Sequence, residues 1–149
     1  MPRPMTDKER KKFLAEPRIA VVSVEAGEGR PPLATPVWFA PTADGGLTFF
    51  TGTQGRPARK KRLIQKTGTV TLCIQNGELP YKYATAEGTV VKAEQPPKPD
   101  EMLAVVSRYM PAEAAQGFVQ GELANPGPSL VQYTVRPDRW LSMDFSDIM

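Results

Sequence analysis

Short apolar segments separated by turn residues recur along most of this chain, and they predict a sheet protein. The segments are rich in β-branched residues, which is typical of antiparallel strands. The expected strands cover residues 18–24, 33–40, 47–51, 69–75, 81–92, 130–136 and 140–145. Pro36 predicts an edge strand or a bulge in the second segment, because proline cannot donate a hydrogen bond to a neighbouring strand. Gly88 predicts a bend or bulge in the fifth.

Helical patterns lie near the N-terminus and before the last strands. Thr6 and Glu9 have the spacing of a capping box, so a short helix is expected to begin there and to end near Pro17. A second helix is expected to start near Pro99 or Asp100. A third is expected to follow over residues 111–119. We expect the apolar residues of this helical pair to cap the sheet or to lie against a partner.

Together these elements predict a mainly β fold. Six or seven antiparallel strands with short links favour a small barrel, which buries one continuous core and removes most exposed edges. A length of 149 residues fits a single domain covering residues 1–149.

A cluster of positive charge follows the strand that ends at Thr51. Five cations occur within seven residues, and they are Arg56, Arg59, Lys60, Lys61 and Arg62. Hydroxyl and N–H donors at a strand end, followed by such cations, can bind a phosphate from several sides. The alternative is a solvated helix face. Leu63 and Ile64 argue against it, because they give a short helix an inner side and leave different cations facing different ways.

The chain contains no histidine. This excludes a Ser-His-Asp or Cys-His triad and a His-ligated metal site, and we expect no metal. The Asp and Glu residues are scattered, and none of them forms a recognisable catalytic pair. If the protein is an enzyme, a bound organic cofactor is expected to supply the chemistry.

Charge and hydropathy bear on whether the chain binds nucleic acid, enters a membrane or is secreted. Lys and Arg number 19 against 16 Asp and Glu, and no known nucleic-acid-binding motif accompanies this small excess, so we expect no nucleic-acid partner. No apolar run has the length of a signal peptide or a membrane span, so neither secretion nor membrane insertion is indicated. Cys73 lies in an alternating apolar stretch and is expected to be buried, and a lone cysteine fits a reducing, cytoplasmic location.

The order of these motifs resembles the split β-barrel flavin-binding proteins related to pyridoxamine 5′-phosphate oxidase, including their deazaflavin-using relatives. The resemblance spans roughly residues 10–145 and consists of RIAVVSV, PPLATPVWF, LTFFTGTQGRPARKKRLIQKTGTVTLCI, PYKYATAEGTVV and VRPDRWLSMDF. It implies a split antiparallel barrel of the Greek-key type. It also implies a homodimer with two cofactor sites at the subunit interface.

The resemblance also implies a set of cofactor-binding residues. The flavin ring is expected to follow one strand segment, formed by Thr35, Pro36, Val37 and Trp38. The ribityl and phosphate portion is expected near the strand end formed by Phe50 and Thr51. Arg59 and Lys60 match the basic pair that holds the phosphate, and Lys61 and Arg56 are the alternatives for this role.

A third group is expected to reach the cofactor of the neighbouring subunit, and it consists of Lys82 or Tyr83 together with Trp140. Each aromatic assignment has a structural alternative. Trp38 and Trp140 can serve packing first, and Thr35 and Thr51 can be ordinary strand residues.

The implied activity is hydride transfer between the flavin ring and a small-molecule substrate of unknown identity. The resemblance implies FMN as the expected cofactor, with the deazaflavin coenzyme F(420) as the alternative, since the polyglutamate tail of F(420) would suit the extra cations. No catalytic acid or base is identified. The chain lacks the longer C-terminal part of true pyridoxamine phosphate oxidases, so that activity is not expected. A flavin, haem or tetrapyrrole carrier without turnover is the alternative function, and a cofactor-free module for another phosphorylated ligand is a further one.

Overall fold

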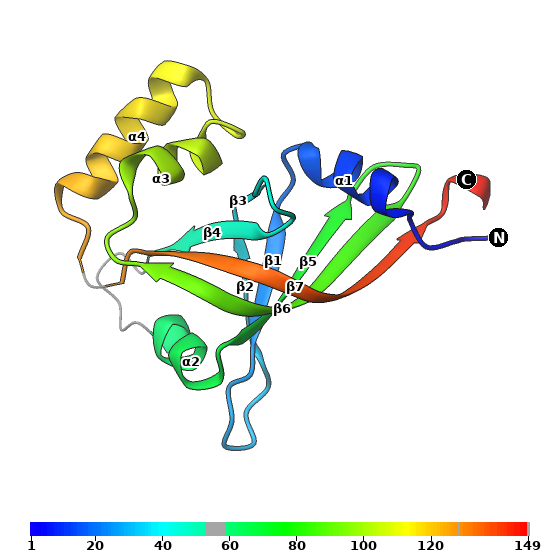
Figure 1. Cartoon of the computed structure of the whole chain (residues 1–149), viewed down its shortest axis with the longest axis horizontal. Coiled ribbons are helices and arrows are strands. Elements are labelled where there is room, and N and C mark those ends of the chain that lie inside the picture. The colour runs from blue at the N-terminus through cyan, green and yellow to red at the C-terminus, as the bar shows by residue number, and fades with distance from the viewer. Residues whose placement is uncertain (53–58, 128, 149) are drawn as a thin grey trace.

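The computed structural model describes residues 1–52, 59–127 and 129–148. Within them, seven antiparallel strands form one sheet in the order β2-β1-β5-β6-β7-β4-β3 (Figure 1). The strands are β1 (Ala20–Val24), β2 (Leu33–Val37), β3 (Phe39–Pro41), β4 (Leu47–Thr51), β5 (Thr69–Asn76), β6 (Lys82–Glu94) and β7 (Val131–Asp144). The predicted mainly β fold is confirmed.

The two edge strands of the sheet are consecutive in the sequence. Only Trp38 separates β2 from β3, yet these strands stand at opposite ends of the strand order. The sheet therefore curls until its two edges approach each other at Trp38, without pairing into a closed barrel. This opening is the split of the barrel, and the prediction that Pro36 belongs to an edge strand is confirmed.

The helices among the described residues are α1 (Asp7–Ala15), α2 (Arg59–Thr67), α3 (Pro99–Val106) and α4 (Ala112–Ala124), followed by the 3-10 helix η1 (Ser146–Ile148). α1 begins with the predicted capping box. The Glu9 N–H donates to the Thr6 hydroxyl at 3.2 Å, and the Thr6 N–H donates to the Glu9 carboxylate at 2.9 Å. None of these helices is both long and apolar enough to cross a membrane.

The prediction of two separate closing strands is wrong, because β7 runs without interruption from Val131 to Asp144. Pro137 lies opposite Gly88 and Arg139 opposite Glu87, which leaves Asp138 as the extra residue of a bulge. A bulge tolerates a proline that would otherwise break the ladder. The predicted irregularity at Gly88 is confirmed at the same place.

The prediction that Cys73 is buried is also wrong. Val70, Leu72 and Ile74 of β5 point into the core, so the strict alternation of a strand turns Cys73 to the outer face, where it is exposed. An apolar neighbourhood in the sequence does not reveal which of two adjacent positions faces inward.

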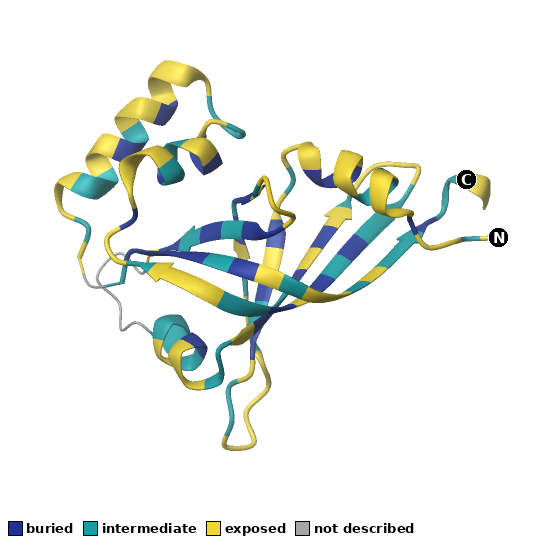
Figure 2. Ribbon diagram, in the orientation of Figure 1, coloured by how far each residue is buried: buried dark blue, intermediate teal, exposed yellow. Residues whose placement is uncertain are grey.

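The buried residues form two clusters. One fills the barrel, with Phe39, Phe49 and Tyr133 among its largest members. The other lies between the helical pair α3–α4 and the outer side of the sheet, where Met102 and Val119 are buried. Figure 2 shows buried positions alternating along the strands and on the inner sides of the helices. The helical pair thus packs on the barrel of its own chain.

Candidate functional site

A cleft of about 510 Å³ lies at the split of the barrel. Its volume falls within the range of roughly 300–1,000 Å³ that is usual for small-molecule sites. The described residues that line it are Ile19, Pro36, Val37, Trp38, Phe50, Thr51, Gly52, Lys60 and Phe118. They come from the edge strand β2 and the Trp38 link that follows it, from the residue before β1, from the end of β4, and from helices α2 and α4.

The backbone at the cleft lies partly outside the hydrogen-bonded ladder. β2 ends at Val37 and β3 begins at Phe39, so Trp38 belongs to neither strand. The hydroxyl of Tyr109 holds this break in place: it accepts from the Phe39 N–H at 3.2 Å and donates to the Arg18 carbonyl at 2.6 Å. Edge and strand-end backbone of this kind can bond a ligand.

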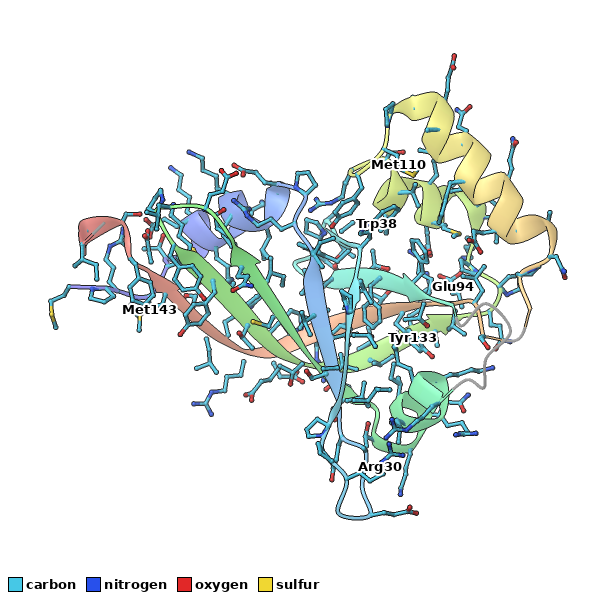
Figure 3. The ribbon with its side chains drawn as sticks, turned by 180° about the vertical axis from the view of Figure 1, so that it is seen from behind. Arg30, Trp38, Glu94, Met110, Tyr133 and Met143 are labelled. Atoms are coloured by element: carbon cyan, nitrogen blue, oxygen red, sulfur yellow. The ribbon has the colours of Figure 1, made fainter. Side chains whose placement is uncertain are left out.

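Aromatic rings form one wall of the cleft. The indole of Trp38 and the ring of Phe118 have centroids 5.8 Å apart, and the rings of Phe50 and Phe118 lie 6.5 Å apart. Figure 3 shows Trp38 on the side of the sheet that faces α3 and α4. Such rings offer a flat apolar surface on which a planar ligand can stack.

Lys60 supplies the positive charge. It lies in the first turn of α2, four residues before the buried Ile64, so both side chains share one face of the helix. Lys60 is half-buried, and burial lowers the pKa of its ammonium group. No ion pair among residues 1–52, 59–127 and 129–148 involves Lys60. A partly desolvated cation of this kind favours an anionic ligand.

The described residues contain no group of three or more His, Cys, Asp and Glu side chains that could hold a metal ion. The described part of the cleft thus offers a ligand three kinds of contact: an aromatic wall, backbone groups outside the strand ladder, and the ammonium group of Lys60.

A family model for pyridoxamine 5′-phosphate oxidase matches residues 6–144. The chain belongs to this family. The resemblance seen in the sequence motifs is thereby confirmed. No curated protein matches the chain.

Solved structures of low sequence identity share the family fold. A conserved hypothetical protein from Mycobacterium tuberculosis is 18% identical with a TM-score of 0.73, and the match covers 95% of this chain and 86% of that one. An F(420) reductase is 21% identical with a TM-score of 0.64, covering 88% and 94%. A FAD-binding protein from Mesorhizobium loti is 14% identical with a TM-score of 0.61, covering 97% and 98%.

In this member of the pyridoxamine 5′-phosphate oxidase family, six of the predicted residues line the one cleft: Pro36, Val37, Trp38, Phe50, Thr51 and Lys60. Thr35 is next to them on β2, and its hydroxyl oxygen is buried without a hydrogen-bond partner in the described part of the chain. The predicted ring segment and strand end thus meet in space.

The other predicted cations are arranged differently. Arg59 precedes Lys60 on α2 but is not among the described lining residues. The ammonium of Lys61 donates to the side-chain oxygen of Gln95 at 2.5 Å, beyond the end of β6. Arg56 lies outside the described residues.

Lys82, Tyr83 and Trp140 lie in another part of the molecule. Thr51, in the cleft, pairs with Val131 at the start of β7, whereas Lys82 pairs with Asp144 at its end. Thirteen residues (144 − 131) separate these positions, which corresponds to up to roughly 40 Å of strand. The ring of Trp140 packs 4.5 Å from the guanidinium of Arg10 and against the barrel core. A single chain does not bring this group to the cleft.

Three lining residues of this family member were not predicted: Ile19, Gly52 and Phe118. Ile19 lies within the strand predicted over residues 18–24, and Gly52 adjoins the strand predicted over 47–51, so their place follows once the strands are located. Phe118 comes from α4, and its position depends on how the helical pair packs against β4. No local signal in the sequence carries that information.

Proposed function

We propose that this chain is a flavin- or deazaflavin-dependent oxidoreductase that transfers hydride to or from a small-molecule substrate. The observation that carries the proposal is the cleft at the split, where an aromatic wall meets a half-buried ammonium group. Both suit a phosphorylated flavin, because its ring is planar with large apolar faces and its phosphate is favoured by a cation. When bound, the cofactor supplies the hydride chemistry at its ring.

Different residues of the cleft are proposed to bind different parts of the cofactor. Trp38 and Phe50 provide apolar surface for the ring, and the backbone around Pro36 provides hydrogen-bonding groups outside the ladder. Thr51 lies at the end of β4, beside the ribityl and phosphate portion. Lys60 binds the phosphate, with Arg59 from the same helical turn as its neighbour. Thr35 is next to these residues on β2 but is not among the described residues that line the cleft, so its contact with the cofactor stays a prediction.

FMN is the first candidate for the cofactor, because the cleft has one lining cation among the described residues and FMN has one phosphate. The deazaflavin coenzyme F(420) is the second. The exposed Arg62 and Lys66 on α2 could interact with its polyglutamate tail, and one structural neighbour is an F(420) reductase.

We further propose a homodimer that forms through the outer face of the sheet. One row of residues crosses five paired strands in register, and it consists of Pro36, Val21, Cys73, Thr85 and Leu141. Val21 is 38% exposed and Leu141 46%. Pro36, Cys73, Val21 and Leu141 of this row are exposed, and Thr85 is half-buried. Exposed apolar side chains that lie together on one face are typical of an interface. The row ends at Pro36, which lines the cleft, so a second copy on this face would lie beside it.

This dimer supports the predicted role of Lys82 and Tyr83. These residues stand at the end of the sheet away from the cleft of their own chain. A second copy related by a twofold axis exchanges the two ends, because the same patch is used on both subunits. Lys82 and Tyr83 are therefore proposed as contributions to the partner's site, whereas the ring of Trp140 packs on the barrel core of its own chain, so its predicted contact with a partner's cofactor stays a prediction.

The test is a fluorescence titration that uses the two tryptophans separately. Trp38 lines the cleft, whereas Trp140 packs beneath Arg10, so a Trp140→Phe variant reports on the cleft alone. We expect saturable quenching by FMN or by F(420), and weaker binding of riboflavin. Absence of binding by all three, or equal quenching in a Trp38→Phe variant, would contradict the proposal.

Turnover separates the enzyme from a carrier. An oxidoreductase with bound cofactor is reduced chemically and then reoxidised by a substrate in a single-turnover measurement. A carrier binds the same cofactor, yet its reoxidation rate does not depend on any added substrate.

A further inference from the structure

A second cavity, of about 560 Å³, lies beneath α3 on the outer face of the sheet. Its floor is formed by Thr48 of β4 with Gln132 and Thr134 of β7, and its walls include Lys92 of β6 and Glu101 of α3. None of these residues lines the cleft at the split. The floor is polar, although the helical pair covers it.

Gln132 is the central residue of this floor. It is only 2% exposed, and its side-chain oxygen is buried without a hydrogen-bond partner among the described residues. A buried acceptor that lacks a donor costs about 1–3 kcal/mol. A residue of this kind that lines a cavity is suited to accept a hydrogen bond from a ligand.

The neighbouring hydroxyl determines which end of the Gln132 amide is unpaired. Thr48 donates its single hydroxyl hydrogen to the Tyr133 carbonyl at 3.0 Å. The Thr48 oxygen can then only accept, and it accepts from the Gln132 amide nitrogen at 3.0 Å. This chain of hydrogen bonds leaves the amide oxygen as the group that requires a donor.

The charges around the cavity favour the same kind of ligand. The charged side chains among the described lining residues are two carboxylates, Asp44 and Glu101, and one ammonium, Lys92. Lys92 is already paired with Glu94 at 2.8 Å and with Glu101 at 3.1 Å. The lining therefore has an excess of negative charge, whereas the charged lining residue described at the split is Lys60. The two cavities thus differ in the sign of their lining charge.

The two cavities are also adjacent. Phe50 lines the cleft at the split and stands directly opposite Gln132 in the β4–β7 ladder. Side chains that face each other in an antiparallel pair have Cβ atoms about 4.5–5.5 Å apart. One cross-strand pair therefore separates a cation-lined aromatic cleft from an acceptor-lined polar cavity.

We infer that the cavity beneath α3 is a second binding site, for a small organic molecule that presents an ammonium or another N–H donor to the Gln132 oxygen. The carboxylates of Asp44 and Glu101 favour the positive charge of that molecule, and Thr134 offers a further hydroxyl. This site does not depend on the proposed flavin site, and the two are tested by different ligands.

The experiment follows ¹⁵N-labelled full-length protein by NMR while n-propylammonium chloride is added, with sodium propionate as a matched anion of the same size. We expect saturable shifts at the Gln132 side-chain amide and at the Thr48 and Thr134 backbone amides with propylammonium, and none with propionate. Gln132→Leu keeps the size of the side chain and removes the acceptor, so affinity should fall roughly tenfold. Gln120→Leu, at an exposed position of α4, is the matched control and should leave affinity unchanged.

A second variant keeps the inference testable if Gln132→Leu does not fold. Ala104 is an exposed lining residue on α3, and Ala104→Leu should block the cavity while leaving Gln132 intact. Loss of propylammonium binding in this variant supports the site. The inference is overturned if propylammonium produces no saturable shifts, if propionate binds equally well, or if binding persists in the variants.

Discussion

The indole of Trp38 stacks on the ring of Tyr109, with centroids 4.9 Å apart and planes only 8° from parallel. The hydroxyl of the same tyrosine joins the start of β3 to the segment before β1 through Phe39 and Arg18. Tyr109 therefore fixes both the aromatic wall and the backbone of the cleft. The residue follows α3, so the helical pair sets the geometry of the barrel opening.

This relationship predicts that Tyr109→Phe lowers the free energy of unfolding by about 1–3 kcal/mol, because the ring still stacks but the Phe39 N–H loses its acceptor. Urea unfolding measures the change. Tyr133→Phe is the matched control. Burial raises the pKa of Tyr133 to about 12, and its hydroxyl lacks a partner within the described residues, so its removal should be neutral or stabilising. Equal losses in both variants would refute the role assigned to Tyr109.

The phosphate assignment predicts a difference between two ligands. The double variant Arg59→Ala, Lys60→Ala should weaken binding of the phosphorylated flavin far more than binding of riboflavin, since each charge-assisted hydrogen bond contributes about 1.5–3 kcal/mol. Titration calorimetry with both ligands measures it. Arg62→Ala with Lys66→Ala removes two exposed cations from the same helix and serves as the control. Equal losses for both ligands would show that the pair does not bind phosphate.

The bulge between β6 and β7 predicts a strong requirement for glycine at one position. A Cβ on Gly88 would collide with the Val135 side chain and would meet the Arg136 carbonyl oxygen at 2.7 Å. Gly88→Ala should therefore destabilise the fold by about 1–3 kcal/mol, as overpacking does. Gly117→Ala in α4 meets nothing within 4 Å, and it should stabilise by about 0.5–1 kcal/mol. Thermal unfolding of the two variants decides whether the bulge is as tight as described.

The proposed dimer predicts that Leu141→Arg produces monomers, because it places a charge in the exposed apolar row. Sedimentation velocity measures the state of association. Leu79→Arg introduces the same charge at a residue that is 75% exposed in the turn before β6, and it should leave the dimer intact. A dimer that survives Leu141→Arg would place the interface elsewhere.

Asp144 predicts a pH dependence. Hydrogen bonds from the Ser146 hydroxyl at 2.5 Å and N–H at 2.8 Å hold the pKa of this carboxyl below its ordinary value. Its folded pKa thus lies below its unfolded pKa, so its contribution to stability is complete above about pH 4 and is lost as the pH falls through the folded pKa. Asp144→Asn should reduce the loss of stability on acidification below roughly pH 4. Asp147→Asn, one residue beyond Ser146, is the control.

Local chemistry explains which parts of the fold were predictable. Three features follow from the chemistry of one or two residues: the capping box at Thr6, the edge position of Pro36 and the irregularity at Gly88. The continuity of β7 was not predictable, because a Pro-Asp pair is compatible both with a bulge inside one strand and with a turn between two strands. The orientation of Cys73 depends on which face of β5 meets the core, and that is a property of the whole sheet.

The lining residues of the candidate site that lie on strands could be predicted from the sequence. Pro36 and Phe50 are far apart in sequence, yet the split brings them to one cleft, as the family motifs imply. Phe118 and Tyr109 arrive through the packing of the helical pair, which leaves no local pattern. The roles of Lys82 and Trp140 depend on a second copy of the chain, and they stay predictions.

The extra residue in β7, Asp138, changes which side chains of the strand face the barrel. Before Asp138, the odd-numbered residues Val131, Tyr133 and Val135 point into the barrel, whereas after it the even-numbered Trp140 packs on the core and Leu141 points out. Without the inserted residue, every side chain of the second half would exchange faces. A single inserted residue thus places Trp140 on the core side of β7 and Leu141 on its outer side. The inward positions are odd-numbered in the first half of the strand and even-numbered in the second half.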